Sequence, residues 1–137
     1  MFDLTDRKAL VTGASGGIGG AIAKALHAQG ATVVLSGTRV GALQSLADEL
    51  GERSHVIACD LSSSEAVQQL IKGCDEAMGY IDVLVNNAGL SRDSLAVRMK
   101  DDDWQSVLDV NLTSSFKLSK ACLRGMMKKR FGRIIGI

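Results

Sequence analysis

A glycine-rich turn joins a short apolar run, residues 9–11, to a helical pattern that starts at Ile18. The turn has the spacing G-x-x-x-G-x-G, with its glycines at Gly13, Gly17 and Gly19. Glycine lets the backbone turn tightly and lets a ligand approach it without meeting a Cβ atom. The first amides of a helix also lack partners within the helix and carry partial positive charge. The stretch therefore predicts a strand, a turn and a helix that can hold a phosphate, although a tight turn for close packing explains the same glycines.

The rest of the chain alternates between strand-like and helix-like patterns. Apolar, β-branched runs are typical of strands buried on both faces, and they fall at residues 31–35, 55–59, 81–85 and 133–137. Helical spacing fills the intervals, at residues 17–27, 39–50, 67–78 and 101–130, with a loop at 86–100. This alternation predicts an α/β fold, a doubly wound parallel sheet of the Rossmann-like kind. By analogy with dinucleotide-binding folds, its first five strands have the order 3-2-1-4-5, with flanking helices.

The ends of two helices carry further signals. Ser62 and Glu65 stand three residues apart and predict a capping box with Ser62 as the N-cap. The long helix begins with three aspartates and ends with a basic run, charges that complement its dipole, and Gly132 is expected to end it. One apolar stripe along this helix comprises Trp104, Leu108, Leu112 and Phe116.

Two loops are expected to form one ligand site. In doubly wound sheets, ligands bind at the carboxyl ends of the strands, where the strand order reverses. In this sheet that place lies between the first and fourth strands. The loops that leave these strands are residues 13–19 and 86–89.

Composition excludes several other functions. The net charge of +1 suggests neither a nucleic acid nor a membrane surface as a partner. The longest uncharged run, residues 9–23, is shorter than the roughly 18 residues that a membrane span needs. An acidic N-terminal stretch is unlike a signal peptide, which favours a cytoplasmic location. Cys59, Cys74 and Cys122 are too far apart to indicate a metal site, so we expect buried thiols in a reducing compartment.

Three motifs occur in a specific order: Thr12-Gly13-x-x-x-Gly17-x-Gly19, then Asp60, then Asn86-Asn87-Ala88-Gly89. In this order they resemble the short-chain dehydrogenase/reductase family over the whole length of the chain. Residues 98–101 and 126–135 resemble in particular the bacterial beta-ketoacyl-acyl-carrier-protein reductases. The resemblance implies one NAD(P)-binding Rossmann domain at residues 1–137, as an N-terminal portion whose C-terminal part is absent.

The resemblance also implies which residues bind the cofactor. In the glycine turn these are Gly13, Ser15, Gly16, Gly17, Ile18 and Gly19, and elsewhere they are Arg39, Asp60, Leu61, Asn87, Ala88 and Gly89, with Asn86 beside them. Asp60 would bind the adenine amino group, although a helix N-cap is the alternative. A plain turn is the alternative for the asparagine loop. Asn111 matches the family's active-site asparagine, which holds a mid-helix distortion and a water of the proton relay, whereas a solvated helix position is its alternative.

The residues after the second strand favour NADP over NAD. An acidic residue there would bond the 2′-hydroxyl of NAD and repel a 2′-phosphate, but the sequence is Ser36-Gly37-Thr38-Arg39. Arg39 can pair with a phosphate through two hydrogen bonds. Many relatives carry arginine where this chain has Gly16, and an exposed position in the first helical turn is the alternative for Arg39.

The implied activity is NADPH-dependent reduction of a 3-oxoacyl thioester, linked to acyl carrier protein, to its 3-hydroxyacyl form in fatty-acid biosynthesis. The family's reaction needs a serine, a tyrosine and a lysine four residues after the tyrosine. The only tyrosine is Tyr80, and Leu84 stands four residues later. We therefore expect residues 1–137 to be inactive alone and to fold poorly or self-associate. The alternatives are a non-catalytic NADP-binding or dimerising module, or a dehydrogenase acting on another small carbonyl or alcohol.

A basic cluster ends the long helix and comprises Lys128, Lys129, Arg130 and Arg133. In the family this region docks acyl carrier protein, which would place the docking site at Lys129 and Arg130. Cations that complement the end of a helix explain the same residues. A homo-oligomer is expected of the full-length form.

Overall fold

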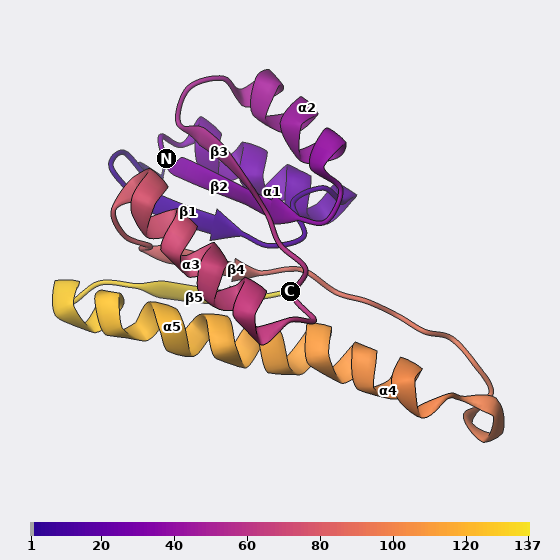
Figure 1. Ribbon diagram of the computed structural model, residues 1–137. Helices are drawn as coiled ribbons and strands as arrows, with labels where there is room; N and C mark the ends of the chain where they lie inside the picture. Colours follow the sequence, from indigo (N-terminus) through magenta and orange to yellow (C-terminus); the bar gives the residue numbers. More distant parts are fainter. Residues whose placement is uncertain (1) are drawn as a thin grey trace.

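A computed structural model describes residues 2–137, and five parallel strands form its single sheet (Figure 1). The strands are β1 (Lys8–Val11), β2 (Thr32–Gly37), β3 (Ser54–Ala58), β4 (Val83–Asn86) and β5 (Arg133–Gly136). Their order is β3-β2-β1-β4-β5, with all four neighbouring pairs parallel. The predicted fold class and strand order are confirmed.

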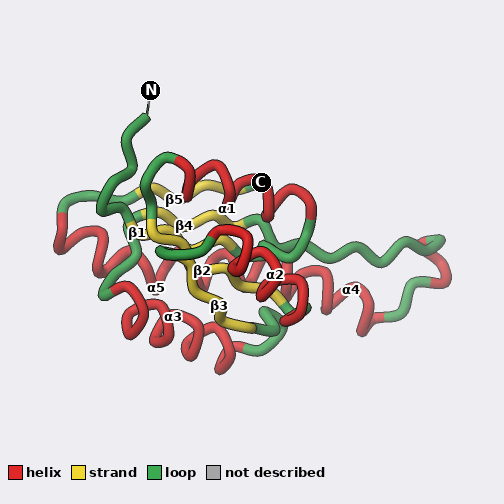
Figure 2. The backbone as a smooth tube through the Cα atoms, turned by 90° about the horizontal axis from the view of Figure 1, so that it is seen from above, coloured by secondary structure: helices red, strands yellow, loops and turns green. Residues whose placement is uncertain are grey.

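Helices cover both faces of this sheet (Figure 2). They are α1 (Gly17–Ala28), α2 (Val40–Leu50), α3 (Ser64–Met78), the short η1 (Ala96–Arg98), α4 (Asp101–Leu108), the π-helix η2 (Asp109–Thr113) and α5 (Ser114–Lys129). Alternate strand residues enter two apolar cores. Val33 and Val83 pack with α1 and α2, whereas Val34 and Leu84 pack with α3 and α5. No helix of residues 2–137 combines the length and apolar character that a membrane span requires.

The three cysteines are buried and free, as expected. Cys74 of α3 and Cys122 of α5 lie in the core between these helices and the sheet. Burial raises the pKa of Cys59 to about 11 and the pKa of each of the other two thiols to about 12. All three are therefore protonated and poorly reactive at neutral pH.

The predicted capping box is wrong by one residue. Ser63 is the N-cap of α3, and its side-chain oxygen accepts a hydrogen bond from the Ala66 amide at 3.3 Å. Ser62 is engaged elsewhere, because its amide and its hydroxyl both donate to Oδ1 of Asp60, at 3.0 and 2.7 Å. An Asp-centred turn therefore precedes the helix and moves the cap to the next serine.

The long helix ends without a glycine cap. Arg130 adopts the left-handed conformation, with φ of 55°, and its amide bonds the Met127 carbonyl. A Cβ atom at Gly132 would lie 2.7 Å from Cβ of Met126. The expected role of Gly132 as the helix terminator is wrong, because its small size instead lets the chain pass against α5 on its way into β5.

Candidate functional site

Thr12 and Asn87 connect the loops that follow β1 and β4. The Thr12 hydroxyl donates to the Val85 carbonyl and accepts from the amides of Asn87 and Ala88, at 3.1 and 3.0 Å. The Asn87 amide group donates in return to the carbonyls of Thr12 and Gly13, at 3.2 and 3.3 Å. The prediction that these loops meet is confirmed, and they form one hydrogen-bonded unit.

The glycines of the turn divide into two kinds. Gly13 has φ of +63°, and a Cβ atom there would lie 2.9 Å from the Ala88 Cα. A Cβ atom at Gly19 would overlap the Gly13 carbonyl oxygen. At Gly17, by contrast, nothing lies within 4 Å of the Cβ position. Close packing therefore explains Gly13 and Gly19, whereas Gly17 leaves the backbone open to a ligand.

No side chain of residues 2–137 caps the first turn of α1. Its N-cap, Gly16, offers no side-chain hydrogen bond, and the turn contains no acidic residue. The leading amides of this 12-residue helix therefore keep their hydrogen-bonding capacity and their partial positive charge. They are suited to bind an anion.

A cavity of about 650 Å³, here called the main cavity, lies over this turn. Of the residues that the sequence nominates for cofactor binding, all but Asn86 line it, namely Gly13, Ser15, Gly16, Gly17, Ile18, Gly19, Arg39, Asp60, Leu61, Asn87, Ala88 and Gly89, whereas Asn86 lines the second cavity described below. Further lining residues include Thr12, Ser36, Leu90, Arg92 and Val110. The binding roles of these residues stay predictions, but the fold brings all of them to one place.

Asp60 is the acidic residue of the main cavity. Its carboxylate accepts both hydrogen bonds from Ser62, which lower the pKa of Asp60 below its usual value. It is ionised at neutral pH and can accept a hydrogen bond from a ligand. The alternative that Asp60 caps α3 is wrong, because Ser63 occupies that position.

Arg39 crosses from the end of β2 to the glycine turn. One guanidinium nitrogen donates to the Ser15 carbonyl at 2.7 Å. Gly16, adjacent to Ser15, has no side chain that could fill this side of the main cavity. Ser36 is buried, and its carbonyl accepts from the Ala14 amide at 3.0 Å, which joins the same two segments through the backbone.

Asn111 lies in the π-helix between α4 and α5. Its side chain accepts from the Leu90 amide at 2.7 Å and donates to the Leu90 carbonyl at 2.8 Å. The expected mid-helix distortion is confirmed. Asn111 is also exposed, as a solvated helix position would be, but its side chain bonds the Leu90 backbone. Asn111 does not line the main cavity but a second cavity of about 670 Å³, which also includes Gly89, Leu90, Ser115 and Ile137. Its catalytic role stays a prediction.

Sequence reasoning missed Thr12 and Arg92 as site residues. Thr12 immediately precedes the first glycine, a position at which a hydroxyl can bond the loop of a neighbouring strand. Arg92 follows the asparagine loop by three residues and lines the main cavity with Arg39. Thr12 opens the glycine motif, but its spacing indicates no role for the hydroxyl, and Arg92 belongs to no motif that spacing identifies.

The main cavity fits a dinucleotide. Open amides suit a diphosphate, an arginine suits a further phosphate, a carboxylate suits an adenine amino group, and the open backbone at Gly17 permits close approach. The second cavity continues from the same loop and is separate from the glycine turn. The arrangement can hold an extended anionic ligand with one end near Arg39 and the other near Leu90.

The comparisons with known proteins agree with this geometry. The family model described as short chain dehydrogenase matches residues 7–137. Nodulation protein G of Rhizobium sp. (strain N33) is 54% identical over 137 residues, and 3-oxoacyl-[acyl-carrier-protein] reductase FabG of Vibrio harveyi is 47% identical over 136 residues. The alignments cover 100% and 99% of this chain but 56% of each relative. The chain thus spans little more than half the length of these relatives, and it belongs to the short-chain dehydrogenase family.

Proposed function

We propose that this chain forms the cofactor-binding part of an NADPH-dependent reductase that converts a 3-oxoacyl thioester on acyl carrier protein to its 3-hydroxyacyl form. The observation that carries the proposal is the main cavity, in which uncapped α1 amides, Asp60 and Arg39 surround one open space. The FabG relative from Vibrio harveyi supports the reductase activity and its substrate. Fatty-acid biosynthesis is the corresponding process.

The preference for NADPH rests on Arg39. The residues from Ser36 to Arg39 include no carboxylate that could bond a 2′-hydroxyl or repel a 2′-phosphate. Arg39 donates to the Ser15 carbonyl beside Gly16, so it brings a guanidinium to the glycine turn, where many relatives carry an arginine. An arginine fork can bind a phosphate through parallel hydrogen bonds.

When bound, the cofactor would supply the hydride. Asn111 would fix the loop at Leu90 under the nicotinamide end, because it bonds both polar groups of that peptide residue. Tyr80 is not suited to donate a proton there. Its hydroxyl lies 3.5 Å from the Asp6 carbonyl, and its ring lies under Lys129 at the other end of the sheet.

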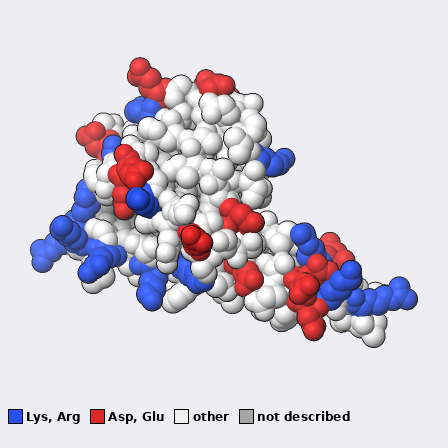
Figure 3. Space-filling model, in the orientation of Figure 1, with Lys and Arg blue, Asp and Glu red and all other residues white. Residues whose placement is uncertain are grey.

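Acyl carrier protein, an acidic partner, would dock at Lys129 and Arg130. Figure 3 shows Lys and Arg side chains gathered over the end of α5, where the basic cluster lies. Opposite charges on two partners speed and orient their encounter. The free, buried thiols support a reducing, cytoplasmic location.

A second copy of this chain would pack on the outer face of α4 and α5. Trp104, Leu112 and Phe116 are each more than half exposed, although they belong to one apolar stripe. The stripe begins beside three aspartates and continues toward the basic cluster. Antiparallel pairing under two-fold symmetry would place opposite charges together at both ends.

Nodulation protein G favours a second candidate, a related reductase with another carbonyl substrate, because that relative has the higher identity of the two. The test of cofactor choice is a titration of the protein that contains this chain, with NADPH and with NADH. We expect NADPH to bind at least tenfold more tightly, and Arg39→Gln to remove most of this preference. Equal affinity for the two cofactors in the wild type would contradict the NADP assignment. Assays of the protein that contains this chain, with acetoacetyl thioesters and with simple ketones, would separate the two candidate substrates.

A further inference from the structure

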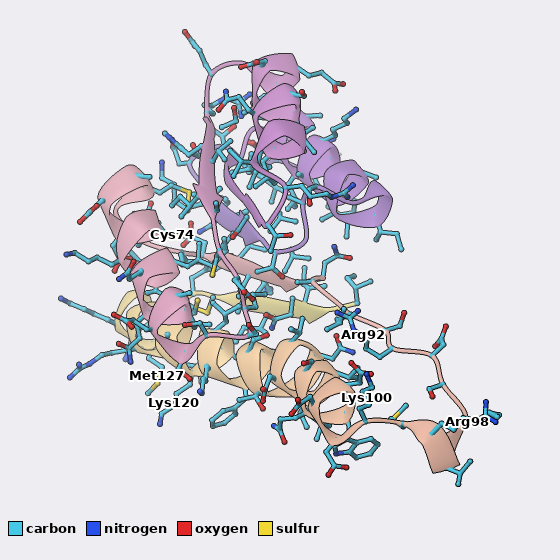
Figure 4. All side chains as sticks on the ribbon, turned by 45° about the vertical axis from the view of Figure 1, so that its right-hand side comes forward. Cys74, Arg92, Arg98, Lys100, Lys120 and Met127 are labelled. Carbon is cyan, nitrogen blue, oxygen red and sulfur yellow. The ribbon has the colours of Figure 1, made fainter. Side chains whose placement is uncertain are left out.

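Arg92 is a second cation that lines the main cavity, besides Arg39. It lies at the base of the arm, defined as residues 91–100, which leaves the body of the molecule between β4 and α4 (Figure 4). Leu90 and Val110 also line the main cavity, and Arg39 follows β2 as the N-cap of α2. The two guanidinium groups therefore come to the main cavity from segments that follow different strands, β2 and β4.

The present partner of Arg92 holds it weakly. Nε of Arg92 lies 3.8 Å from Oδ1 of Asp103 in the first turn of α4, and Nη1 donates to the Ser91 carbonyl at 3.2 Å. A charge-assisted hydrogen bond is shorter, about 2.7–2.9 Å. Both side chains are nearly half exposed, and exposed ion pairs of this kind contribute little to stability. Arg92 can therefore exchange this carboxylate for another anion.

We propose that Arg92 binds the diphosphate of the dinucleotide and leaves Asp103 when it does so, an inference that rests on the proposed cofactor site. A ligand that extends from Arg39 to Leu90 must pass the amides of Gly17 and Ile18. These amides carry only partial positive charge, equivalent to about half a charge for the whole helix end. A diphosphate carries about two negative charges, so a full cation on the open side of the cavity complements the amides. The guanidinium fork suits two phosphate oxygens at once.

Asp103 then acts as a competitor. Its carboxylate occupies the guanidinium in the absence of a ligand, so dinucleotide binding and the Arg92–Asp103 pair exclude each other. Removal of the negative charge at position 103 would leave Arg92 free for phosphate. A purely structural ion pair that fixes the arm would behave in the opposite way, because its loss would disorder the cavity wall and weaken binding.

The test is calorimetric titration of the whole protein that contains this chain, with NADPH and with NADH at low salt. Arg92→Gln should weaken the binding of both cofactors by the same factor, about five- to tenfold, because both contain the diphosphate. Arg39→Gln should weaken NADPH only. Arg98→Gln, at the tip of the same arm and outside the lining of the main cavity, is the matched control and should change neither (Figure 4).

Asp103→Asn provides the second, independent measurement. It should tighten the binding of both cofactors about two- to threefold, the value of one exposed ion pair. Asp102→Asn, which removes the same charge from the same helical turn, should have no effect. Circular dichroism of each variant verifies that the fold is retained.

The outcomes separate this inference from the proposed function. If the wild type binds NADPH but Arg92→Gln binds it within twofold of the wild-type affinity, the role of Arg92 is refuted and the cofactor site remains. Weaker binding by Asp103→Asn would refute the exchange and support a structural ion pair. If the wild type binds neither cofactor, the proposed function fails and this inference fails with it.

Discussion

The two ends of the parallel sheet use similar residues in different ways. At the carboxyl end, Arg39 and Arg92 border a cavity whose remaining wall consists largely of backbone and small side chains. At the amino end, cations lie over aromatic rings. Lys129 lies 2.7 Å from the centre of the Tyr80 ring, and Arg7 lies 3.7 Å from the centre of the Phe131 ring.

The difference shows what makes a cation available to a small ligand. At the amino end the charge is already directed at an aromatic face, and the site presents a surface suited to a macromolecule. At the carboxyl end the charges accompany open amides in a concave space, which suits a small anion. Lys and Arg content alone does not distinguish the two sites, whereas the neighbouring groups do.

The strongest way to test this contrast is to fill the packed part of the glycine turn. Gly19→Ala would place a methyl group on the Gly13 carbonyl oxygen. We expect the free energy of unfolding to fall by about 2–3 kcal/mol, with loss of dinucleotide binding. Gly17→Ala is the control, because its methyl group meets nothing within 4 Å. Urea denaturation should show it to be as stable as the wild type, while titration shows weaker NADPH binding. Equal destabilisation by both changes would contradict the division of the glycines into two kinds.

A smaller effect is expected from the link between the two cavity loops. Thr12→Val removes the acceptor of the Asn87 and Ala88 amides while preserving side-chain shape. The Asn87 amide keeps the Val85 carbonyl as a second acceptor, but the Ala88 amide loses its partner, which should lower the free energy of unfolding by about 2 kcal/mol and weaken cofactor binding with it. Lys129→Gln at the amino end should cost about 0.5 kcal/mol and leave NADPH affinity unchanged. A loss of NADPH affinity in Lys129→Gln would show that the two ends are not independent.

The smallest effect concerns pH. Hydrogen bonds from Ser62 lower the pKa of Asp60 in the folded state from its ordinary value of 3.8. Asp60 therefore contributes stability above the unfolded-state pKa, and this contribution is lost as pH falls through the lower, folded-state value. Ser62→Ala should reduce the dependence of stability on pH in that acidic window and change little at pH 7. Urea denaturation at a series of acidic pH values measures this, with Ser94→Ala in the arm as the control. Ser62→Ala keeps the amide donor, so an unchanged pH profile would mean that the Ser62 hydroxyl does not lower the Asp60 pKa.

Much of the fold could be predicted because its signals are local or additive. The β-branched run at Ala31–Leu35 indicates a strand wherever it lies, and alternation with helices then limits the topology. The meeting of the loops at residues 13–19 and 86–89 followed from the rule that loops at adjacent carboxyl ends converge, whereas Arg39, Asp60 and Leu61 followed from the family resemblance. These predictions needed no knowledge of individual side-chain contacts.

The details that sequence failed to predict depend on competition between near neighbours. Ser62 and Ser63 have the same side chain. Ser63 is the N-cap of α3 because the amide and the hydroxyl of Ser62 both bond Asp60. Arg130 adopts a conformation in which glycine is the usual residue, so spacing pointed to Gly132 instead. Arg92 gains a role only because the arm leaves the body at the rim of the main cavity, a path that no local pattern encodes.

The Asn111 side chain bonds Leu90 in the pattern of two paired β-strand residues. Its oxygen accepts from the Leu90 amide, and its nitrogen donates to the Leu90 carbonyl. An aspartate has the same outline but only acceptors when ionised, so one of its oxygens would face the Leu90 carbonyl and repel it. Which substitutions position 111 tolerates therefore depends on having one acceptor and one donor at the end of the side chain, rather than on side-chain size. Asn111, in the π-helix between α4 and α5, therefore fixes the position of Leu90 in the lining of the main cavity, through a side-chain amide that acts like a backbone peptide group.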